Sequence, residues 1–155
     1  MYVSQKCQYA IRALLDLAKH YGRGPVPTSA TALSQAVPQR FLEVIMNELK
    51  AHGLVVSRRG VRGGYELARD PAGLTVGEVI RLIDGPLDPV RCTRDWERVC
   101  CPLKDRCSLI DLWSRAKQAV EAVYDGTTFG QLAEAEGREA ASARGEINSP
   151  GPRSL

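Results

Sequence analysis

Apolar residues recur at steps of three and four through the first twenty positions, which is the spacing of one buried face of an α-helix. The stripe consists of Cys7, Ala10, Ile11, Leu14, Leu15, Ala18 and Tyr21. Glycine and proline follow at positions 22–27 and should end the helix, because neither residue supports a helix interior. The pattern therefore predicts a first amphipathic helix that packs on a core through one face.

Two further helices are predicted before residue 53, with a short break between them. The first covers about 29–35 and should turn Ala32 and Leu33 inward. The second covers about 39–51, and Gly53 suits the position just after its end. The predicted buried face of this second helix is Phe41, Leu42, Ile45, Met46 and Leu49.

The pattern then changes to that of a β-hairpin. Residues 54–58, LVVSR, are rich in β-branched side chains, and residues 65–68, YELA, alternate between apolar and polar. The turn between them, RGVRGG at 59–64, holds three glycines and two arginines. Three helices followed by such a hairpin have the element order of a winged helix–turn–helix.

Three more helices are predicted after the hairpin. The stretch TVGE at 75–78 is a capping box that opens the first of them. A longer amphipathic helix over about 108–124 has the apolar face Leu109, Leu112, Trp113, Ala116, Val120 and Val123. A second box, Thr128 with Gln131, opens a short helix that should end near Ala135. From residue 136 the chain is mostly small and charged, so we expect a disordered tail.

Composition places the chain among ordinary globular proteins, with 44% hydrophobic and 25% charged residues. The net charge of +3 is too small to indicate a partner, but sixteen of the 21 basic residues are arginine, which suits phosphate and guanine. No run of about eighteen apolar residues is present, and the first residues lack the features of a signal peptide. We therefore expect a cytoplasmic protein, in which thiols stay reduced.

The helix predicted over 39–51 is the candidate for reading DNA, because a helix–turn–helix places its second helix in the major groove. The residues predicted to face outward near its start are Gln39, Arg40 and Glu43, with Asn47 one turn further on. Arginine pairs with guanine, glutamine and asparagine pair with adenine, and glutamate accepts from cytosine. A helix face that is merely solvated would have a similar composition.

The predicted hairpin tip carries Arg58, Arg59 and Arg62 among glycines. Glycine lets a backbone approach a groove closely, and arginine is attracted to the negative potential of a narrow minor groove. A tip of this kind, taken alone, would be only a solvated turn. Its position directly after a helix–turn–helix predicts that the protein binds DNA.

Four of the five cysteines lie in RCTRDWERVCCPLKDRC, residues 91–107, which we name the cysteine segment. Cys92, Cys101 and Cys107 have the spacing C-x8-C-x5-C, and Cys100 adjoins Cys101. This is the spacing of neither a zinc ribbon nor a ferredoxin. Three thiolates on one irregular segment can still converge on a metal, and the basic residues around them would offset their charge. Spacing alone leaves a metal site and a set of free reduced thiols equally open.

The sequence resembles the IscR/NsrR/RirA family of bacterial winged-helix, cluster-binding transcription regulators. The stretches SQKCQYAIRALLDLA, QRFLEVIMNELKAHGLVVSRRGVRGGYELARD, TVGEVIRLIDGPL and CCPLKDRC carry the resemblance, which covers about residues 1–135. It implies a homodimer held by the long helix after the cysteine segment. It also implies a [2Fe-2S] or [4Fe-4S] cluster on Cys92, Cys101 and Cys107, with Glu43 as a base reader and Arg59 in the minor groove.

The chain departs from this family at the fourth cluster ligand. The iron–sulfur-assembly regulators have a histidine three residues after the last cysteine, where this chain has Ile110. The nitric-oxide-sensing members use an acidic residue of the first helix, where this chain has Gln8. The fourth ligand would then be Cys100, a residue of the partner subunit, or a water or small thiol. A cluster held in this way would be labile, which suits a sensor.

The leading hypothesis is a homodimeric transcription regulator that binds a palindromic operator in double-stranded DNA. Its iron–sulfur cluster would sense iron, cluster status, oxygen or nitric oxide. One alternative keeps the DNA binding but makes the chain a cluster-free thiol switch or a metabolite-responsive regulator, and another is a winged-helix adaptor for proteins. An enzyme is not expected, because no paired carboxylates or phosphate-binding loop stand out.

The predicted fold class is mainly α with a small β-hairpin, namely a winged helix–turn–helix with a long C-terminal dimerisation helix. The predicted division has four parts. They are a DNA-binding domain over 1–86, a cysteine-rich cluster-binding loop over 87–107, a dimerisation helix with a short helix over 108–135, and a disordered tail over 136–155.

Overall fold

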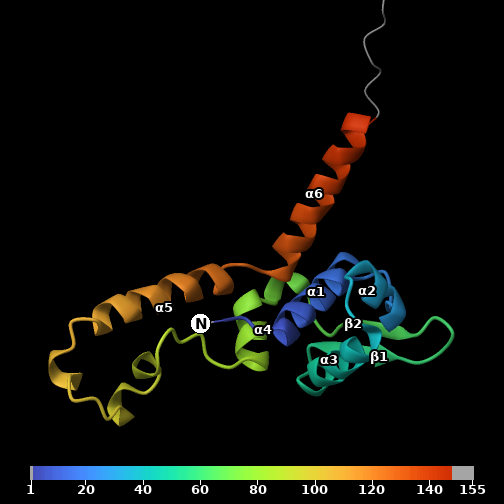
Figure 1. Ribbon diagram of the computed structural model, residues 1–155. Coiled ribbons are helices and arrows are strands. Elements are labelled where there is room, and N and C mark those ends of the chain that lie inside the picture. Colours follow the sequence, from blue (N-terminus) through green and yellow to red (C-terminus); the bar gives the residue numbers. More distant parts are fainter. Residues whose placement is uncertain (1, 148–155) are drawn as a thin grey trace, which may run out of the picture.

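The computed structural model describes residues 2–147 and contains the predicted elements in the predicted order (Figure 1). The helices and strands of the first half are α1 (Gln5–Lys19), α2 (Thr28–Ser34), α3 (Gln39–Ala51), β1 (Val55–Arg58), β2 (Gly64–Leu67) and α4 (Val76–Ile83). The second half holds α5 (Ile110–Asp125) and α6 (Phe129–Ile147). Short 3-10 turns are η1 (Pro71–Gly73), η2 (Arg91–Thr93), η3 (Trp96–Arg98) and η4 (Lys104–Arg106). Within the described residues the fold is mainly α with one antiparallel hairpin, as predicted.

The helix α1 lies at the centre of the body and packs against α2, α3, α4 and the start of α6. Ser4 caps α1, because its hydroxyl accepts a hydrogen bond from the Cys7 amide at 3.1 Å. The Asp84 carboxylate, just beyond α4, accepts from both the amide and the hydroxyl of Ser4. The largest fully buried side chains of this core include Leu14, Leu17, Leu42, Ile45, Met46, Leu49, Leu74, Val79 and Phe129.

The bounds of α3 match the predicted helix over 39–51, and Gly53 has the expected left-handed backbone with φ +71°. Three predicted core positions are wrong. Tyr21 is 46% exposed, because α1 ends at Lys19 before reaching it. Leu33 is 85% exposed, because the short helix α2 buries Thr31 and Ala32 instead. Phe41 is 41% exposed at the edge of α3, where its ring meets Tyr9 edge to face at a centroid distance of 5.8 Å.

The hairpin is held against the body by a short bridge to the segment before α2. Strand β1 pairs with β2 from Val55 opposite Leu67 to Arg58 opposite Gly64. Val26 then bonds to Tyr65 through both backbone groups, at 2.8 and 2.9 Å. A side chain at Gly64 would place its Cβ 2.1 Å from the Val26 carbonyl oxygen, so this close approach requires glycine.

The two predicted capping boxes lie at α4 and α6. Thr75 accepts from the Glu78 amide at 3.2 Å, while Thr128 and Gln131 cap one another's amides at 3.2 and 3.0 Å. The expectation of a short helix ending near Ala135, with a disordered tail from 136, is wrong as far as Ile147, because α6 continues to that residue. Its alanine, glutamate and arginine content favours helix. Residues 148–155 lie outside the described part.

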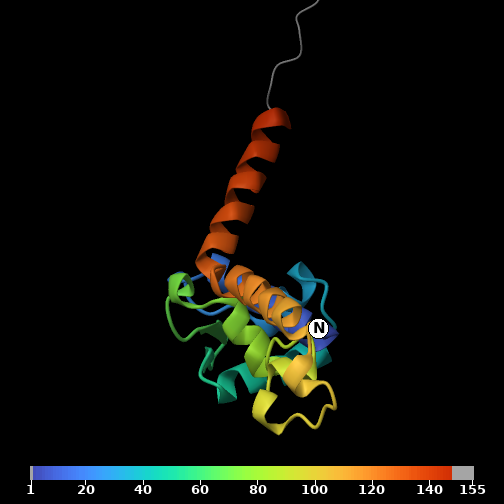
Figure 2. The ribbon, with the colours of Figure 1, turned by 90° about the vertical axis from the view of Figure 1, so that its left-hand side faces the viewer.

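Two arms leave the body in different directions. Figure 2 shows α6 rising away from the body, and Figure 1 shows α5 and the cysteine segment extending to the left of it. Phe129 is fully buried and anchors the start of α6 in the core, whereas α5 has no buried residue. No helix in the described residues is long and apolar enough to cross a membrane.

Candidate nucleic-acid interface and cysteine segment

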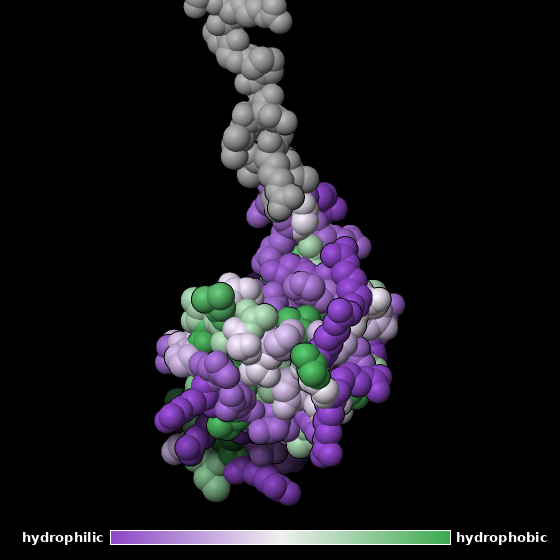
Figure 3. All heavy atoms as spheres, turned by 90° about the vertical axis from the view of Figure 1, so that its right-hand side faces the viewer, coloured by the Kyte–Doolittle hydropathy of each residue, from purple (hydrophilic) through white to green (hydrophobic). Residues whose placement is uncertain are grey.

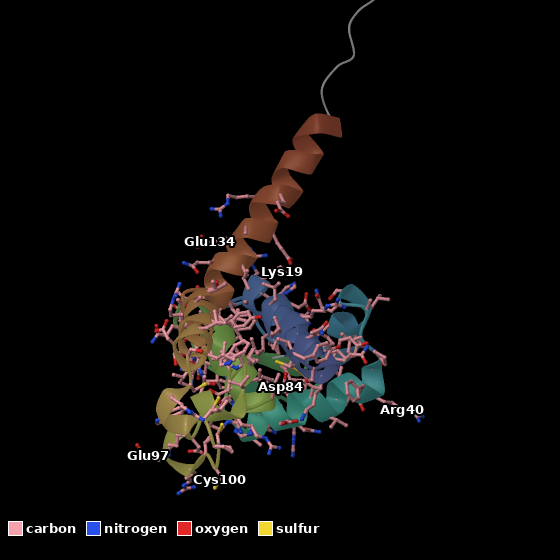
Figure 4. All side chains as sticks on the ribbon, turned by 60° about the vertical axis from the view of Figure 1, so that its left-hand side comes forward. Lys19, Arg40, Asp84, Glu97, Cys100 and Glu134 are labelled. Atoms are coloured by element: carbon pink, nitrogen blue, oxygen red, sulfur yellow. The ribbon has the colours of Figure 1, made fainter. Side chains whose placement is uncertain are left out.

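The outer face of α3 carries all four predicted reading residues. Gln39, Arg40, Glu43 and Asn47 are each exposed, because the opposite face holds the buried residues of this helix. The Gln39 amide donates to a Glu43 carboxylate oxygen at 3.2 Å, so these two side chains already hold one another. Arg40 points away from the body in Figure 4, and no ion pair holds it among the described residues. The face therefore presents donors and acceptors at helical spacing.

Two hydrogen bonds fix the hairpin relative to α3. The Tyr65 hydroxyl of β2 donates to the Asn47 side-chain oxygen at 3.3 Å, and Lys50 donates to the Ser57 hydroxyl of β1 at 2.7 Å. Helix and hairpin thus form one unit, from which the basic tip extends outward (Figure 1). Asn47 is partly engaged by Tyr65, which its position in the sequence did not indicate.

The three predicted hairpin arginines divide into two kinds. Arg58 donates from Nε to Glu66 across the strands at 2.7 Å, so part of its charge is compensated. Arg59 and Arg62 are exposed, and neither has an ion-pair partner among the described side chains. Figure 3 views the end of the molecule that carries the hairpin, where hydrophilic residues predominate and hydrophobic ones are scattered. The free positive charge of the tip therefore belongs to Arg59 and Arg62.

The cysteine segment lines an open pocket of about 710 Å³ that lies away from α3. Figure 4 places the labelled Cys100 and Arg40 on different sides of the molecule. The pocket is lined by Arg91, Cys92, Arg94, Asp95, Arg98, Val99, Cys100 and Cys101. Cys92 and Cys101 therefore share a site with Cys100, whereas Cys107 is not among the lining residues. Three arginines make the site favourable to negative charge.

The thiols suit an iron–sulfur cluster in their chemistry and number, but they do not lie close enough together in this structure to hold one. Thiolates are the usual ligands of such clusters, and all four cysteines of the segment are free. Cys92 and Cys107 are half-buried, and Cys100 and Cys101 are exposed. Within residues 2–147, no three cysteine, histidine, aspartate or glutamate side chains are gathered closely enough to hold a metal ion. Cys107 would have to move toward the pocket to join the other two.

The fifth cysteine has a structural role, as the apolar stripe predicts. Cys7 is fully buried in α1, and burial together with the nearby Asp84 carboxylate raises the pKa of its thiol to about 12. At Gln8, one of the two positions where the resemblance led us to look for a fourth ligand, the side chain donates to the Val3 carbonyl at 3.0 Å.

The pattern of the sequence did not reveal the role of Asp88, which precedes the cysteine segment. Its carboxylate accepts from Lys117 Nζ of α5 at 2.8 Å and from Arg94 Nε at 2.9 Å. These hydrogen bonds outweigh the opposing effect of burial, so the pKa of Asp88 is lowered. In the sequence, the sign that could have indicated this role is that Asp88 is a single acidic residue between two prolines, next to a strongly basic segment.

Known proteins resemble the chain over most of its length. The family model described as Rrf2, iron-dependent transcriptional regulator, matches residues 3–135. The transcriptional regulator CymR of Bacillus subtilis is 36% identical over 133 residues, which cover 86% of this chain and 90% of that protein. IscR of Sodalis glossinidius is 35% identical over 132 residues, which cover 85% of this chain and 78% of that protein.

Solved structures give the same result. The structure of CymR, the global cysteine regulator of B. subtilis, superposes with a TM-score of 0.73 at 34% identity, covering 86% of this chain and 97% of that one. The IscR structure from T. potens has a TM-score of 0.68 at 30% identity, covering 98% and 94% of the two chains. These relatives are named as transcription regulators rather than enzymes. The chain therefore belongs to the Rrf2 family of transcriptional regulators.

Proposed function

We propose that this protein is a homodimeric regulator that binds a palindromic operator, and that the chemical state of its cysteine segment changes its affinity for that operator. DNA would be read by Gln39, Arg40, Glu43 and Asn47 in the major groove and by the hairpin arginines in the minor groove. The observation that carries the proposal is the single unit formed by α3 and the hairpin, with Arg59 and Arg62 uncompensated at its tip. The molecule would act in the cytoplasm, where its operator is.

The uncovered face of α5 supports a homodimer. Leu109, Leu112 and Val123 are between 49% and 64% exposed, although they belong to the apolar stripe of that helix. Apolar side chains aligned on one helix face are typical of a surface that a second subunit covers. A two-fold dimer would present two α3 helices to two half-sites of a palindrome.

For the cysteine segment, the leading form of the proposal is an iron–sulfur cluster held by Cys92, Cys101 and Cys107. Three thiols on one segment and the IscR relatives support it. A bound cluster would supply a redox-active, labile group. The cysteine segment would respond to the loss or the change of that group. Cys100, or a group from outside this chain, would provide the fourth ligand in place of Ile110 and Gln8.

A thiol switch without a cluster is the second candidate, and one observation favours it. Cys100 and Cys101 are exposed and line one pocket with Cys92, so that thiols rather than a metal would respond to an oxidant there. The relationship to CymR, named as the global cysteine regulator of B. subtilis, also supports this form. Both candidates keep the same DNA-binding unit and the same proposed division of the chain near residues 86 and 107.

Anaerobic purification separates the two forms. A brown protein with visible absorbance that is lost in Cys92→Ser, Cys101→Ser and Cys107→Ser, but kept in Cys100→Ser, supports the cluster on the proposed ligands. A colourless protein with stoichiometric zinc contradicts the iron–sulfur form. A metal-free protein that loses the mass of two hydrogens on oxidation supports the thiol switch. Failure of every form of the protein to bind any promoter fragment would refute the regulator itself and favour an adaptor.

A further inference from the structure

Asp88 holds a charged carboxylate in a nearly closed environment outside the helices. Its side chain is 3% exposed, although the residue lies in the connection between α4 and η2. Buried charges persist in proteins where they are paired, and Asp88 is paired twice, with Lys117 at 2.8 Å and Arg94 at 2.9 Å. The surrounding structure thus holds this carboxylate in one position.

Two of the partners of Asp88, Thr93 and Arg94, directly follow Cys92. The Thr93 hydroxyl donates to the Val90 carbonyl at 2.7 Å and lies 3.4 Å from the Asp88 carboxylate. Lys117 also reaches the Thr93 carbonyl, at 3.5 Å. The turn η2, which contains Cys92, is therefore held between Asp88 and the middle of α5.

The other side-chain contacts of the cysteine segment are internal, and its backbone also meets the start of α5, where the Ile110 amide donates to the Cys107 carbonyl at 3.4 Å. Lys104 donates to the Glu97 carbonyl at 3.0 Å and lies over the Trp96 ring at 5.8 Å from its centroid. Among the described side chains, the hydrogen bonds from residues 91–107 to α5 or to the connection before the segment involve only Asp88, Val90 and Lys117. A change in the segment that moves the Cys92 turn must therefore act on this group of contacts.

We propose that Asp88 is a positioning residue that couples the Cys92 turn to α5 through Lys117, so that a change at the cysteines shifts this helix. The inference rests on the proposed function, because it supplies the link between the cysteine segment and the helix that would join the two subunits. A small shift of α5 changes the spacing of the two reading helices and so the affinity for a palindrome.

The variant that tests this is Lys117→Met, in the full chain. It removes the donor from α5 but keeps the aliphatic stem, and it leaves Asp88 its Arg94 partner. The matched control is Asp125→Asn, which removes the ion pair between Asp125 of α5 and Arg81 of α4, away from the cysteines. Circular dichroism checks that each variant folds, and Asp88→Asn replaces Lys117→Met if the latter does not.

The measurement is the operator dissociation constant in two states of the cysteines. The DNA is a duplex selected from a random library with the wild type. The states are anaerobically reduced protein, and the same protein after reconstitution with iron and sulfide or after peroxide. For each protein we take the quotient of the dissociation constants in the two states. We expect it to be at least about fivefold in the wild type and in Asp125→Asn, and within about twofold of unity in Lys117→Met. The inference is overturned, while the proposed function stands, if Lys117→Met keeps the quotient of the wild type. The same holds if Asp125→Asn loses the quotient as fully as Lys117→Met does.

A quotient of one in the wild type refutes the proposed sensing, and this inference with it. A second readout needs no cluster. Because coupling between two sites is reciprocal, operator binding should change the alkylation rate of Cys92, followed by mass spectrometry, in the reduced wild type and in Asp125→Asn. The rate should not respond to DNA in Lys117→Met, and an unchanged response there contradicts the proposal.

Discussion

Arg40 and Arg62 both present a positive charge without an ion-pair partner among the described residues, but they belong to different surfaces. Arg40 stands on the reading face of α3, and Arg62 stands at the hairpin tip. A guanidinium that pairs with a base edge affects specificity, whereas one that meets only phosphate or groove potential affects affinity for all sequences. The two positions therefore predict different consequences for the same substitution.

Arg40→Ala should weaken operator binding by about 1–3 kcal/mol and relax the preference at one base pair of each half-site. Arg62→Ala should weaken binding to all sequences and reduce the slope of log K against log salt by about 1 for each subunit. Fluorescence anisotropy across a salt series, with the operator and its single-base variants, measures both. Arg69→Ala is the control, because Arg69 is already paired with Glu78. Equal loss in all three variants would contradict a specific role for either arginine.

Cys7 predicts a dependence of stability on pH. Burial raises the pKa of its thiol to about 12 in the folded protein, whereas a thiol in an unfolded chain ionises near about 8.5. Above that pH the unfolded state loses the proton first, so the free energy of unfolding should fall by up to about 1.4 kcal/mol per pH unit until the folded thiol ionises. The stabilisation is fully present below about pH 8.5.

Urea unfolding of the wild type and of Cys7→Ala between pH 8 and 11 tests this prediction. The alanine variant loses the ionising group, so the difference in unfolding free energy between the two proteins should shrink as the pH rises. Titration of other groups cancels in that difference. Two curves that stay parallel over the whole range would show that Cys7 does not titrate as its burial requires.

At the scale of elements, the hairpin depends on the contact between Gly64 and the segment before α2. A Cβ at this position would lie 2.1 Å from the Val26 carbonyl oxygen and 2.3 Å from its carbon, and both atoms belong to backbone that cannot rotate away. That carbonyl also accepts the Tyr65 amide in the bridge that holds the hairpin. The glycine is thus part of the attachment of the hairpin to the body.

Gly64→Ala should cost about 2–3 kcal/mol in the free energy of unfolding, because the clash breaks this bridge. Gly73→Ala, in η1, is the matched control, since nothing lies within 4 Å of a Cβ built there, and it should change stability by less than about 0.5 kcal/mol. Urea denaturation of both variants checks the difference. Equal stability of the two variants would mean that the body can shift to admit a side chain at Gly64.

Elements with strong local signals could be predicted from the sequence, and contacts between them could not. The spacing of apolar residues and the capping residues predicted α3, the hairpin and the two capping boxes. The predictions that Leu33 and Phe41 are buried were wrong, because an apolar stripe does not show where a neighbouring element stops covering it. The hydrogen bond between Asp88 and Lys117 joins residues 29 positions apart, and only the packing of α5 brings them together.

At the scale of the whole molecule, the body and its arms have different requirements for stability. The body buries its core within one chain, and Phe129 joins α6 to that core. By contrast α5 has no fully buried residue. Its Tyr124 is partly buried against the core, and two ion pairs, Arg81 with Asp125 and Lys117 with Asp88, tie the helix to the body. The exposed pair of Arg81 and Asp125 orients the helix but contributes little to its stability. A second subunit would supply the apolar contacts that α5 lacks.

Leu112→Glu combined with Val123→Glu should therefore convert a dimer into a folded monomer, because both side chains lie on the exposed apolar stripe of α5. Loss of the second reading helix should weaken operator binding by at least about 100-fold. Analytical ultracentrifugation and anisotropy measure the two effects, and Gln118→Glu, an exposed position on the other side of α5, controls for added charge. A wild type that is monomeric at concentrations where it binds the operator, or a double variant that remains dimeric, would show that α5 does not join the subunits.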